Sequence, residues 1–283
     1  RQGQSTSLEG IQDPAAPQWA NSQANWGRGN SGSRLSEFYL DKTFKDQGIS
    51  IRLGRMGLGT EFNTMACDFH SNAFCAAQMG KWQGKLWYNT PVSQWGGRVK
   101  YQINPELFAQ VGVFEYNPEN ALERHGWNLD TKNADGVNIL SEAVWSPKKG
   151  LNDLPGSYRV GVLYNTADDA KNQYDVAYKA GTVGEDRSYG GWISFEQQLT
   201  SAGEGRRGLH SFANFTFHDR TTTQVDHSQQ IGLKYIGTLD GHPNDIIGLG
   251  VNRVHVNDRF RSTKEILNKG EEYNIELNYS YYP

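Results

Sequence analysis

Apolar and polar residues alternate with a period of two along most of this chain. Ile49, Ile51 and Leu53, for example, alternate with Ser50 and Arg52. Such alternation indicates half-buried β-strands, and no long segment shows the 3.6-residue stripe of a helix. About eleven strands are predicted, at residues 35–44, 49–53, 98–103, 107–116, 137–145, 158–165, 192–199, 209–218, 230–235, 248–252 and 273–281. Tight turns such as Asn104-Pro105 would join neighbours into an antiparallel meander.

Residues 56–94 interrupt this alternation between two predicted strands. Hairpin loops usually have about two to five residues, and a structureless loop longer than about 15 is usually functional. The loop holds the only two cysteines, Cys67 and Cys75, which are close enough in sequence to form a disulfide. Closing so short a loop would contribute roughly 2.5 kcal/mol. We therefore expect residues 56–94 to fold into the lumen of a β-barrel and narrow it, with residues 1–283 forming a single barrel domain.

The two strand faces favour a barrel in lipid. A strand of about 10 residues, rising about 3.3 Å each and tilted by about 45°, spans roughly 23 Å, close to the apolar band of an outer membrane. Aromatic residues lie near strand ends on the apolar face, as in an interfacial girdle: Trp145, Tyr158, Tyr164, Phe217, Tyr235, Tyr273 and Tyr281. The other face is polar and small, as in a water-filled channel. The fold predicted is an all-β, transmembrane antiparallel β-barrel; a soluble β-sandwich with one hydrated face is the alternative.

Composition changes this picture little. The net charge of -3 provides no basic field for a nucleic-acid partner. No apolar run approaches the roughly 18 residues of a membrane helix, and a low mean hydropathy does not exclude membrane strands. The chain begins at Arg1 in polar sequence, as a mature or trimmed form would, and the two cysteines suit an oxidising compartment. The seven histidines show no metal-ligand spacing, so neither a metal nor a cofactor is expected.

Charged residues of both signs are predicted on the inner face and in the long loop. They are Arg34, Glu37, Arg52, Arg55, Glu61, Asp68, Arg98, Lys100, Glu142, Arg159 and Glu196. Guanidinium groups and carboxylates can bind the acceptor and donor sides of sugar hydroxyls. Trp82, Trp87, Tyr88 and Trp95 could provide an aromatic platform for the sugar ring. Any one charged residue on such a face can be merely solvated, whereas the whole set indicates a polar solute.

Several strings of this sequence resemble the carbohydrate-selective porins of the OprB type. They include RLSEFYLDKTF, GRMGLGTEFN, TPVSQWGGRVKY, VGVFEYNPEN, LPGSYRVGVLYNT, GRRGLHSFANFT and GLGVNRVHVNDR, and they extend over almost all of the chain. The resemblance implies a sixteen-stranded barrel in the bacterial outer membrane that passes glucose and related small sugars by passive diffusion. In the family, inward loops form a constriction that is lined with arginines and acidic residues.

The resemblance also suggests which residues form the constriction. The GR and EF elements of the family match Gly54-Arg55 and Glu61-Phe62, and its paired cysteines match Cys67 and Cys75. The predicted constriction comprises Arg34, Glu37, Arg55, Glu61, Trp95, Arg98, Glu142 and Arg159. The eleven predicted strands are too few for a sixteen-stranded barrel, so the chain is expected to be incomplete at both ends. Because an open sheet edge in lipid is costly, these residues alone are not expected to form the working pore.

Two other classes of function remain open from the sequence. A secreted glycoside hydrolase would use two of Glu37, Glu61, Glu142 and Glu196, with their carboxyl groups about 5 to 9.5 Å apart. A soluble lectin would bind sugar without chemistry. The porin hypothesis predicts no enzyme activity, sugars and outer-membrane lipid as partners, and a homotrimer or a monomer.

Overall fold

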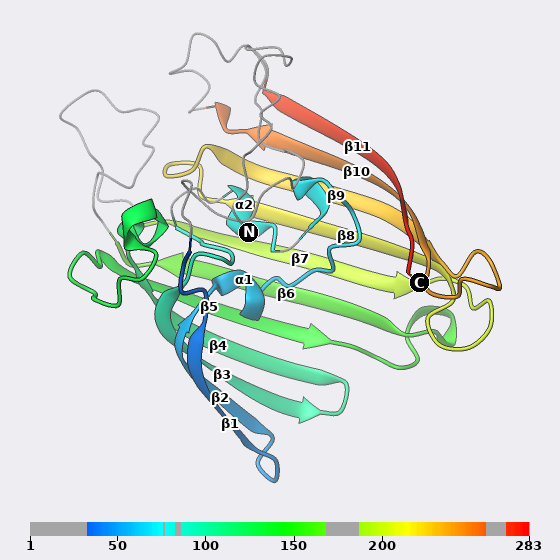
Figure 1. The fold of residues 1–283 in the computed structure, drawn as a ribbon, viewed down its shortest axis with the longest axis horizontal. Coiled ribbons are helices and arrows are strands. Elements are labelled where there is room, and N and C mark those ends of the chain that lie inside the picture. The colour runs from blue at the N-terminus through cyan, green and yellow to red at the C-terminus, as the bar shows by residue number, and fades with distance from the viewer. Residues whose placement is uncertain (1–32, 76, 83–85, 168–186, 259–269, 283) are drawn as a thin grey trace.

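A computed structural model describes residues 33–75, 77–82, 86–167, 187–258 and 270–282. They form a single sheet in which every strand pairs antiparallel with its neighbours in the chain (Figure 1). The strands are β1 (Phe38–Phe44), β2 (Ile49–Met56), β3 (Gln94–Asn104), β4 (Leu107–Tyr116), β5 (Gly136–Trp145), β6 (Gly156–Asn165), β7 (Tyr189–Gln198), β8 (Gly208–His218), β9 (Val225–Ile236), β10 (Ile246–Val256) and β11 (Glu271–Ser280). The prediction of an all-β chain with about eleven strands is confirmed.

The two ends of the sheet differ in their connections. Residues 45–48 and 105–106 make short turns at one end, whereas residues 57–93 and 117–135 make long connections at the other. This asymmetry is typical of outer-membrane barrels, whose short turns face the periplasm. Within the described ranges, no helix has the length and apolar character needed to cross a membrane. In the described part of the chain β1 and β11 each pair with one strand, so the sheet has two edges.

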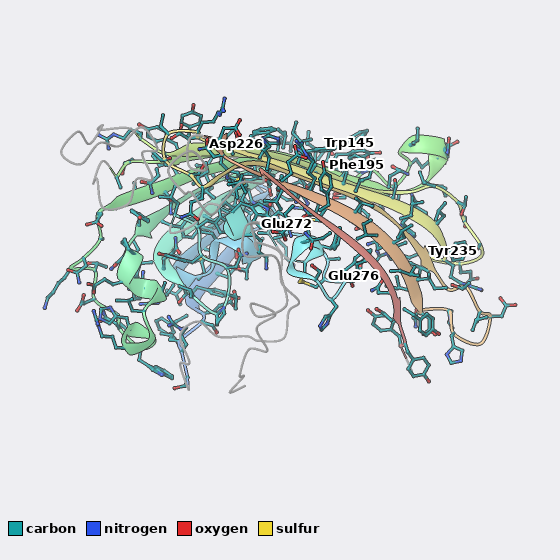
Figure 2. All side chains as sticks on the ribbon, turned by 90° about the horizontal axis from the view of Figure 1, so that it is seen from above. Trp145, Phe195, Asp226, Tyr235, Glu272 and Glu276 are labelled. Carbon is teal, nitrogen blue, oxygen red and sulfur yellow. A yellow bond between two sulfur atoms is a disulfide. The ribbon has the colours of Figure 1, made fainter. Side chains whose placement is uncertain are left out.

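The convex face of the sheet is apolar. Figure 2 shows the sheet as an arch, with Trp145 and Phe195 on its outer side. Alternate residues along each strand present large apolar side chains on this face, and Ile275 and Leu277 are both 74% exposed. Other exposed members of this face are Leu53, Val99, Val111, Val113, Ile139, Val160, Val162, Ile193, Ile231, Leu233, Leu249 and Val251. Such a continuous apolar surface suits contact with lipid acyl chains.

Two arginine substitutions in β10 test the contact with lipid. Val251 and Ile247 lie on the same face and are equally exposed, at 39% each, but Val251 is central in the strand and Ile247 is near its end. Val251→Arg is expected to lower the free energy of unfolding by about 2–4 kcal/mol, because arginine at the bilayer midplane is poorly solvated; Ile247→Arg should cost at most about 1 kcal/mol. Urea unfolding in lipid vesicles measures the free energy of unfolding of each variant. Equal losses in the two variants would contradict the predicted membrane depth.

The concave face holds polar residues and glycines, and the connection 57–93 lies against it (Figure 1). Some of these glycines provide the space in which aromatic side chains of the connection pack. A Cβ atom at Gly112 would lie 2.8 Å from the Phe62 ring, and one at Gly250 would lie 2.8 Å from the Phe74 ring. Separations this short are sterically excluded, so any larger residue there would push the connection away from the wall.

Part of the inner wall is dry, although its polar pattern suggested water along its length. Where the connection 57–93 covers the wall, Leu140, Leu163 and Trp192 are fully buried against it. They join a cluster whose other members are Met56, Leu58, Phe62, Ala77, Met79, Trp87 and Phe114. Apolar burial contributes about 25 cal/mol per Å², so this cluster stabilises the packed position of the connection.

Candidate functional site

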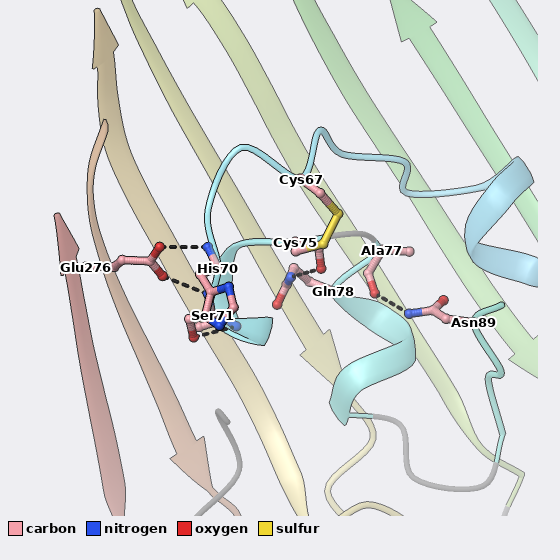
Figure 3. The surroundings of a disulfide bond; sticks show 9 residues. Cys67, His70, Ser71, Cys75, Ala77, Gln78, Asn89 and Glu276 are labelled. Carbon is pink, nitrogen blue, oxygen red and sulfur yellow. Dashed lines mark hydrogen bonds between the residues drawn. A yellow bond between two sulfur atoms is a disulfide. The ribbon is translucent and has the colours of Figure 1, made fainter. Parts of the chain in front are cut away.

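The connection between β2 and β3 is a compact unit, which we call the inner loop (residues 57–93). It contains α1 (Leu58–Glu61), η1 (Asn72–Phe74) and α2 (Met79–Trp82). A disulfide joins Cys67 to Cys75 (Figure 3). Asn89 Nδ2 donates a 3.0 Å hydrogen bond to the Ala77 carbonyl, and the Leu58 N–H donates to the Tyr88 carbonyl at 3.1 Å, which ties the two ends of the loop together. The loop is therefore cross-linked within itself.

Polar contacts hold the inner loop against β9 to β11. The carboxylate of Glu276 accepts hydrogen bonds from the backbone N–H groups of His70, at 2.7 Å, and Ser71, at 2.8 Å (Figure 3). Lys234 Nζ lies 2.6 Å from the Asp68 carboxylate and 3.2 Å from that of Glu196. The Lys234 side chain is only 3% exposed, and these two carboxylates are its ionic partners in the buried position.

An ionic cluster forms where the first turn of the inner loop meets β2 and β3. The Glu61 carboxylate accepts hydrogen bonds from Arg52 Nη1, at 2.5 Å, and from Arg98 Nε, at 3.0 Å. Arg52 also binds Asp41, at 2.7 Å, and Arg98 Nη1 donates to Ser50 Oγ, at 3.0 Å. Charge-assisted hydrogen bonds of this kind are short and directional, so the two guanidinium groups are held in fixed positions.

Glu142 on β5 provides a second anchor for the loop. Its carboxylate accepts hydrogen bonds from the Asn63 backbone N–H at 2.8 Å, Trp192 Nε1 at 2.9 Å and Gln110 Nε2 at 3.1 Å. Arg159 Nη1 lies 3.6 Å away and supplies a positive charge. The Glu142 side chain is completely buried. A buried carboxylate requires such partners, and three elements of the fold converge on it to provide them.

A pocket of about 410 Å³ opens between the inner loop and β6 to β9. Charged side chains of both signs line it: Asp68, Arg159, Glu196, Arg206 and Lys234. Phe69, Phe74 and Phe212 add apolar ring faces. Arg159 lies in both the pocket wall and the Glu142 cluster. Opposite charges beside aromatic rings suit a solute with hydroxyl groups and an apolar ring face.

The structure brings together four of the eight residues that the sequence assigned to the constriction: Glu61, Arg98, Glu142 and Arg159. Arg55 and Trp95 lie elsewhere. Arg55 pairs with Trp95 across β2 and β3, and Arg52, three residues earlier on β2, pairs with Arg98. Successive side chains of a strand point to opposite faces, so the first pair lies on the face opposite the ionic cluster. Arg55 is buried at the rim, where its Nε donates to Ser93 Oγ at 2.9 Å.

Arg34 and Glu37 also lie outside this cluster. Arg34 Nη1 donates to the Asn120 carbonyl at 2.6 Å, and its Nη2 donates to the Leu122 carbonyl at 2.8 Å. It therefore fastens the segment before β1 to the connection between β4 and β5. Glu37 directly precedes β1 and is exposed. The structure thus separates a rim network around Arg34 and Arg55 from the cluster under the inner loop.

The expected aromatic platform of Trp82, Trp87, Tyr88 and Trp95 is wrong, because three of these residues are buried and the fourth lies on the other face. Trp87 is fully buried, and Trp82 and Tyr88 are each 2% exposed. Trp87 packs edge-on against Trp192, with ring centroids 5.7 Å apart. These rings hold the loop on the wall because burying them removes large apolar areas from water, so none can stack on a sugar. The fourth, Trp95, lies on the opposite face.

The four carboxylates considered for hydrolysis offer no acid–base pair. Glu61 and Glu142 are buried and accept several hydrogen bonds each. Glu196 is paired with Lys234 and, at 3.0 Å, with Arg206, while Glu37 lies apart. Glycoside hydrolysis needs one carboxyl group able to give a proton and another to attack or activate water. The arrangement instead suits fixed charges along a passage.

Sequence reasoning did not assign Arg52, Asn63, Gln110 and Trp192 to the constriction. Arg52 shares a strand face with Arg98, and Gln110 and Trp192 occupy inner positions of their strands. The period of two could have identified these three as candidates. Asn63 carried no such signal because the loop has no periodicity.

Comparisons with known proteins agree in pointing to one family. A model described as "Carbohydrate-selective porin, OprB family" matches residues 1–283. Porin B of Pseudomonas aeruginosa is 39% identical over 303 residues, with 99% of this chain and 66% of the relative covered. The putative porin QuiX of Acinetobacter baylyi is 38% identical over 306 residues, with 99% of this chain and 68% of the relative covered. The chain thus spans about two thirds of the length of these curated relatives.

Two solved structures share the fold. One is described as the high pH structure of Pseudomonas putida OprB; it gives a TM-score of 0.86 at 40% identity, covering 97% of this chain and 70% of the other. The low pH structure of the same protein gives a TM-score of 0.54 at 31% identity, covering 88% of this chain and 57% of the other. The curated relatives are named as porins, which are channels and not enzymes.

Proposed function

Because this chain belongs to the carbohydrate-selective porin family OprB, we propose that it forms part of a channel for passive diffusion of glucose and related small neutral sugars. The family consists of β-barrels of the bacterial outer membrane, and the protein is located there. The exposed apolar convex face and the hydrophilic concave face support a barrel that separates lipid from solute.

The inner loop is the proposed constriction. One observation carries this proposal: Glu61 of the loop lies between Arg52 and Arg98 of the wall. Nearby, Glu142 and Arg159 continue the alternation of charge toward the pocket. Arg52 and Arg159 are each 23% exposed at the side chain, so both can contact a passing solute.

Sugar passage would exchange hydrogen bonds rather than break covalent bonds. Hydroxyl oxygens accept from the guanidinium groups, and hydroxyl protons are donated to carboxylate oxygens. Phe69 and Phe212 can cover the apolar side of the ring from within the pocket. Conduction requires a site weak enough to release the solute, so we expect half-saturation in the millimolar range, on the order of -4 kcal/mol or weaker.

Planar bilayers containing the full-length protein test this function. Glucose added to one side is expected to lower the single-channel ion current saturably, because an occupied constriction excludes ions. A polyethylene glycol of similar size is the control, since it should lower the current in proportion to its concentration, without saturation. A normal ion current that glucose leaves unchanged would overturn the proposed sugar site.

A further inference from the structure

Two histidines face each other on neighbouring strands, away from the inner loop. His227 of β9 and His255 of β10 are cross-strand partners. Their imidazole rings stack with centroids 4.4 Å apart and an interplanar angle of 14°. The pair lies at the strand ends next to the long connections. His227 is four residues from Ile231 and His255 is four residues from Val251, so both histidines lie on the apolar outer face. A local sequence pattern does not predict this pair, because its members come from different strands.

A β-bulge adds a carboxylate to the pair. The register of β9 and β10 shifts between His255 and Val256, which pairs with Val225 and leaves Asp226 as the extra residue. Bulges change the direction of a side chain, and here Asp226 turns toward both rings. Its Oδ1 lies 2.8 Å from His227 Nδ1 and 2.6 Å from His255 Nδ1. The three potential ligand atoms all lie within 4.8 Å of one another.

We propose that Asp226, His227 and His255 form a binding site for a divalent transition-metal ion, with Zn²⁺ the best match. Two imidazoles and one carboxylate are a common zinc ligand set, with metal–ligand distances of about 2.0–2.2 Å, and water would complete the tetrahedron. Each imidazole would bind through Nδ1 as the tautomer protonated on Nε2, in place of the present contact between its Nδ1 and Asp226. Because the ligands come from two strands, the ion would cross-link β9 and β10 at the outer rim.

The surrounding charges orient the site and limit its affinity. Arg220 Nε lies 3.3 Å from the second carboxylate oxygen of Asp226, and such a partner fixes the orientation of a ligand. Arg253 Nη1 lies 3.4 Å from His227 Nε2 and is itself paired with Glu271. Two nearby cations oppose a divalent ion, so we expect a dissociation constant on the order of micromolar rather than the far tighter binding of closed structural zinc sites.

Calorimetric titration of ZnCl₂ into full-length protein in detergent, stripped with EDTA, tests the site. One ion per chain is expected at pH 7.5, on the order of micromolar, and at least tenfold weaker binding is expected in Asp226→Asn and His255→Gln. His242→Gln is the matched control and should bind Zn²⁺ as the wild type does. His242 also faces a carboxylate, that of Asp245 at 3.7 Å, but among the described residues no second histidine joins this pair.

A measurement on the unmodified protein keeps the test independent of variant folding. A metal ion binds only the neutral imidazole ring, so protons compete with the metal for the two histidines. The affinity for Zn²⁺ should therefore fall at least tenfold between pH 7.5 and pH 5.5. Binding weaker than about 1 mM at pH 7.5, binding unaffected by both Asp226→Asn and His255→Gln, or binding unchanged at pH 5.5 would each overturn the proposal.

Discussion

Replacing Glu142 with alanine should detach the inner loop from the wall and widen the channel. The substitution removes an acceptor from three donors, Asn63 N–H, Trp192 Nε1–H and Gln110 Nε2–H, and a counter-charge from Arg159. Breaking a buried ionic contact by removing one partner costs about 3–5 kcal/mol. We therefore expect a lower urea midpoint for unfolding, a higher single-channel conductance and loss of the saturable block by glucose.

Two further variants separate the role of Glu142 from a general loss of charge. Glu142→Gln keeps one acceptor oxygen and should give an intermediate conductance. Glu37→Ala removes an exposed carboxylate outside the cluster and should behave as the wild type. A Glu142→Ala channel with wild-type conductance and an unchanged urea midpoint would show that the loop is held in place without this anchor.

Replacing Glu61 with alanine should alter selectivity more than stability. The variant frees the guanidinium groups of Arg52 and Arg98 from their shared carboxylate. Gln110 Nε2 donates to the Glu61 backbone carbonyl at 2.7 Å, and this contact survives in the alanine variant. We expect a loop that stays in position, a reversal potential shifted toward anions, and a glucose half-blocking concentration about tenfold higher, which corresponds to about 1.4 kcal/mol.

Arg55→Ala is the contrast to Glu61→Ala, because the sequence analysis assigned Arg55 and Glu61 to the same constriction. Arg55 is 1% exposed and donates to Ser93 Oγ at 2.9 Å, to the Asn128 carbonyl and to Asn120 Oδ1 at 3.3 Å. Its loss should destabilise the rim by about 1–3 kcal/mol, because buried acceptors lose their donor, and should leave the glucose block unchanged. If Arg55→Ala weakened the block by glucose as strongly as Glu61→Ala does, both residues would have to contribute to the sugar site.

The bulged histidine pair adds a feature that is independent of sugar passage. The outer face carries apolar side chains at Ile231 and Val251. Four residues away on the same strands, toward the long connections, it carries His227 and His255. A metal ion at this position would act on strand pairing at the rim, so its removal should leave the ionic cluster around Glu61 intact. The zinc and sugar experiments therefore report on separate parts of the molecule.

The alternation of apolar and polar residues was enough to predict the strands and the two faces of the sheet. Side chains alternate strictly along a strand, so a short stretch is enough to assign Ile275 and Leu277 to one face and Glu276 to the other. All eleven predicted strands are present, with ends that differ by a few residues. The sequence also singled out the inner loop as an exception, because alternation stops there and the two cysteines lie within it.

Which charges meet, in contrast, depends on how the loop packs against the sheet. Arg52 and Arg55 are near neighbours in sequence and point to opposite faces, and the loop brings Glu61 to Arg52 and Arg98 but not to Arg55. The loop has no period that could predict the position of Asn63 or the burial of Trp87. Their positions depend on packing against strands that are distant in sequence, and a local pattern carries no information about such contacts.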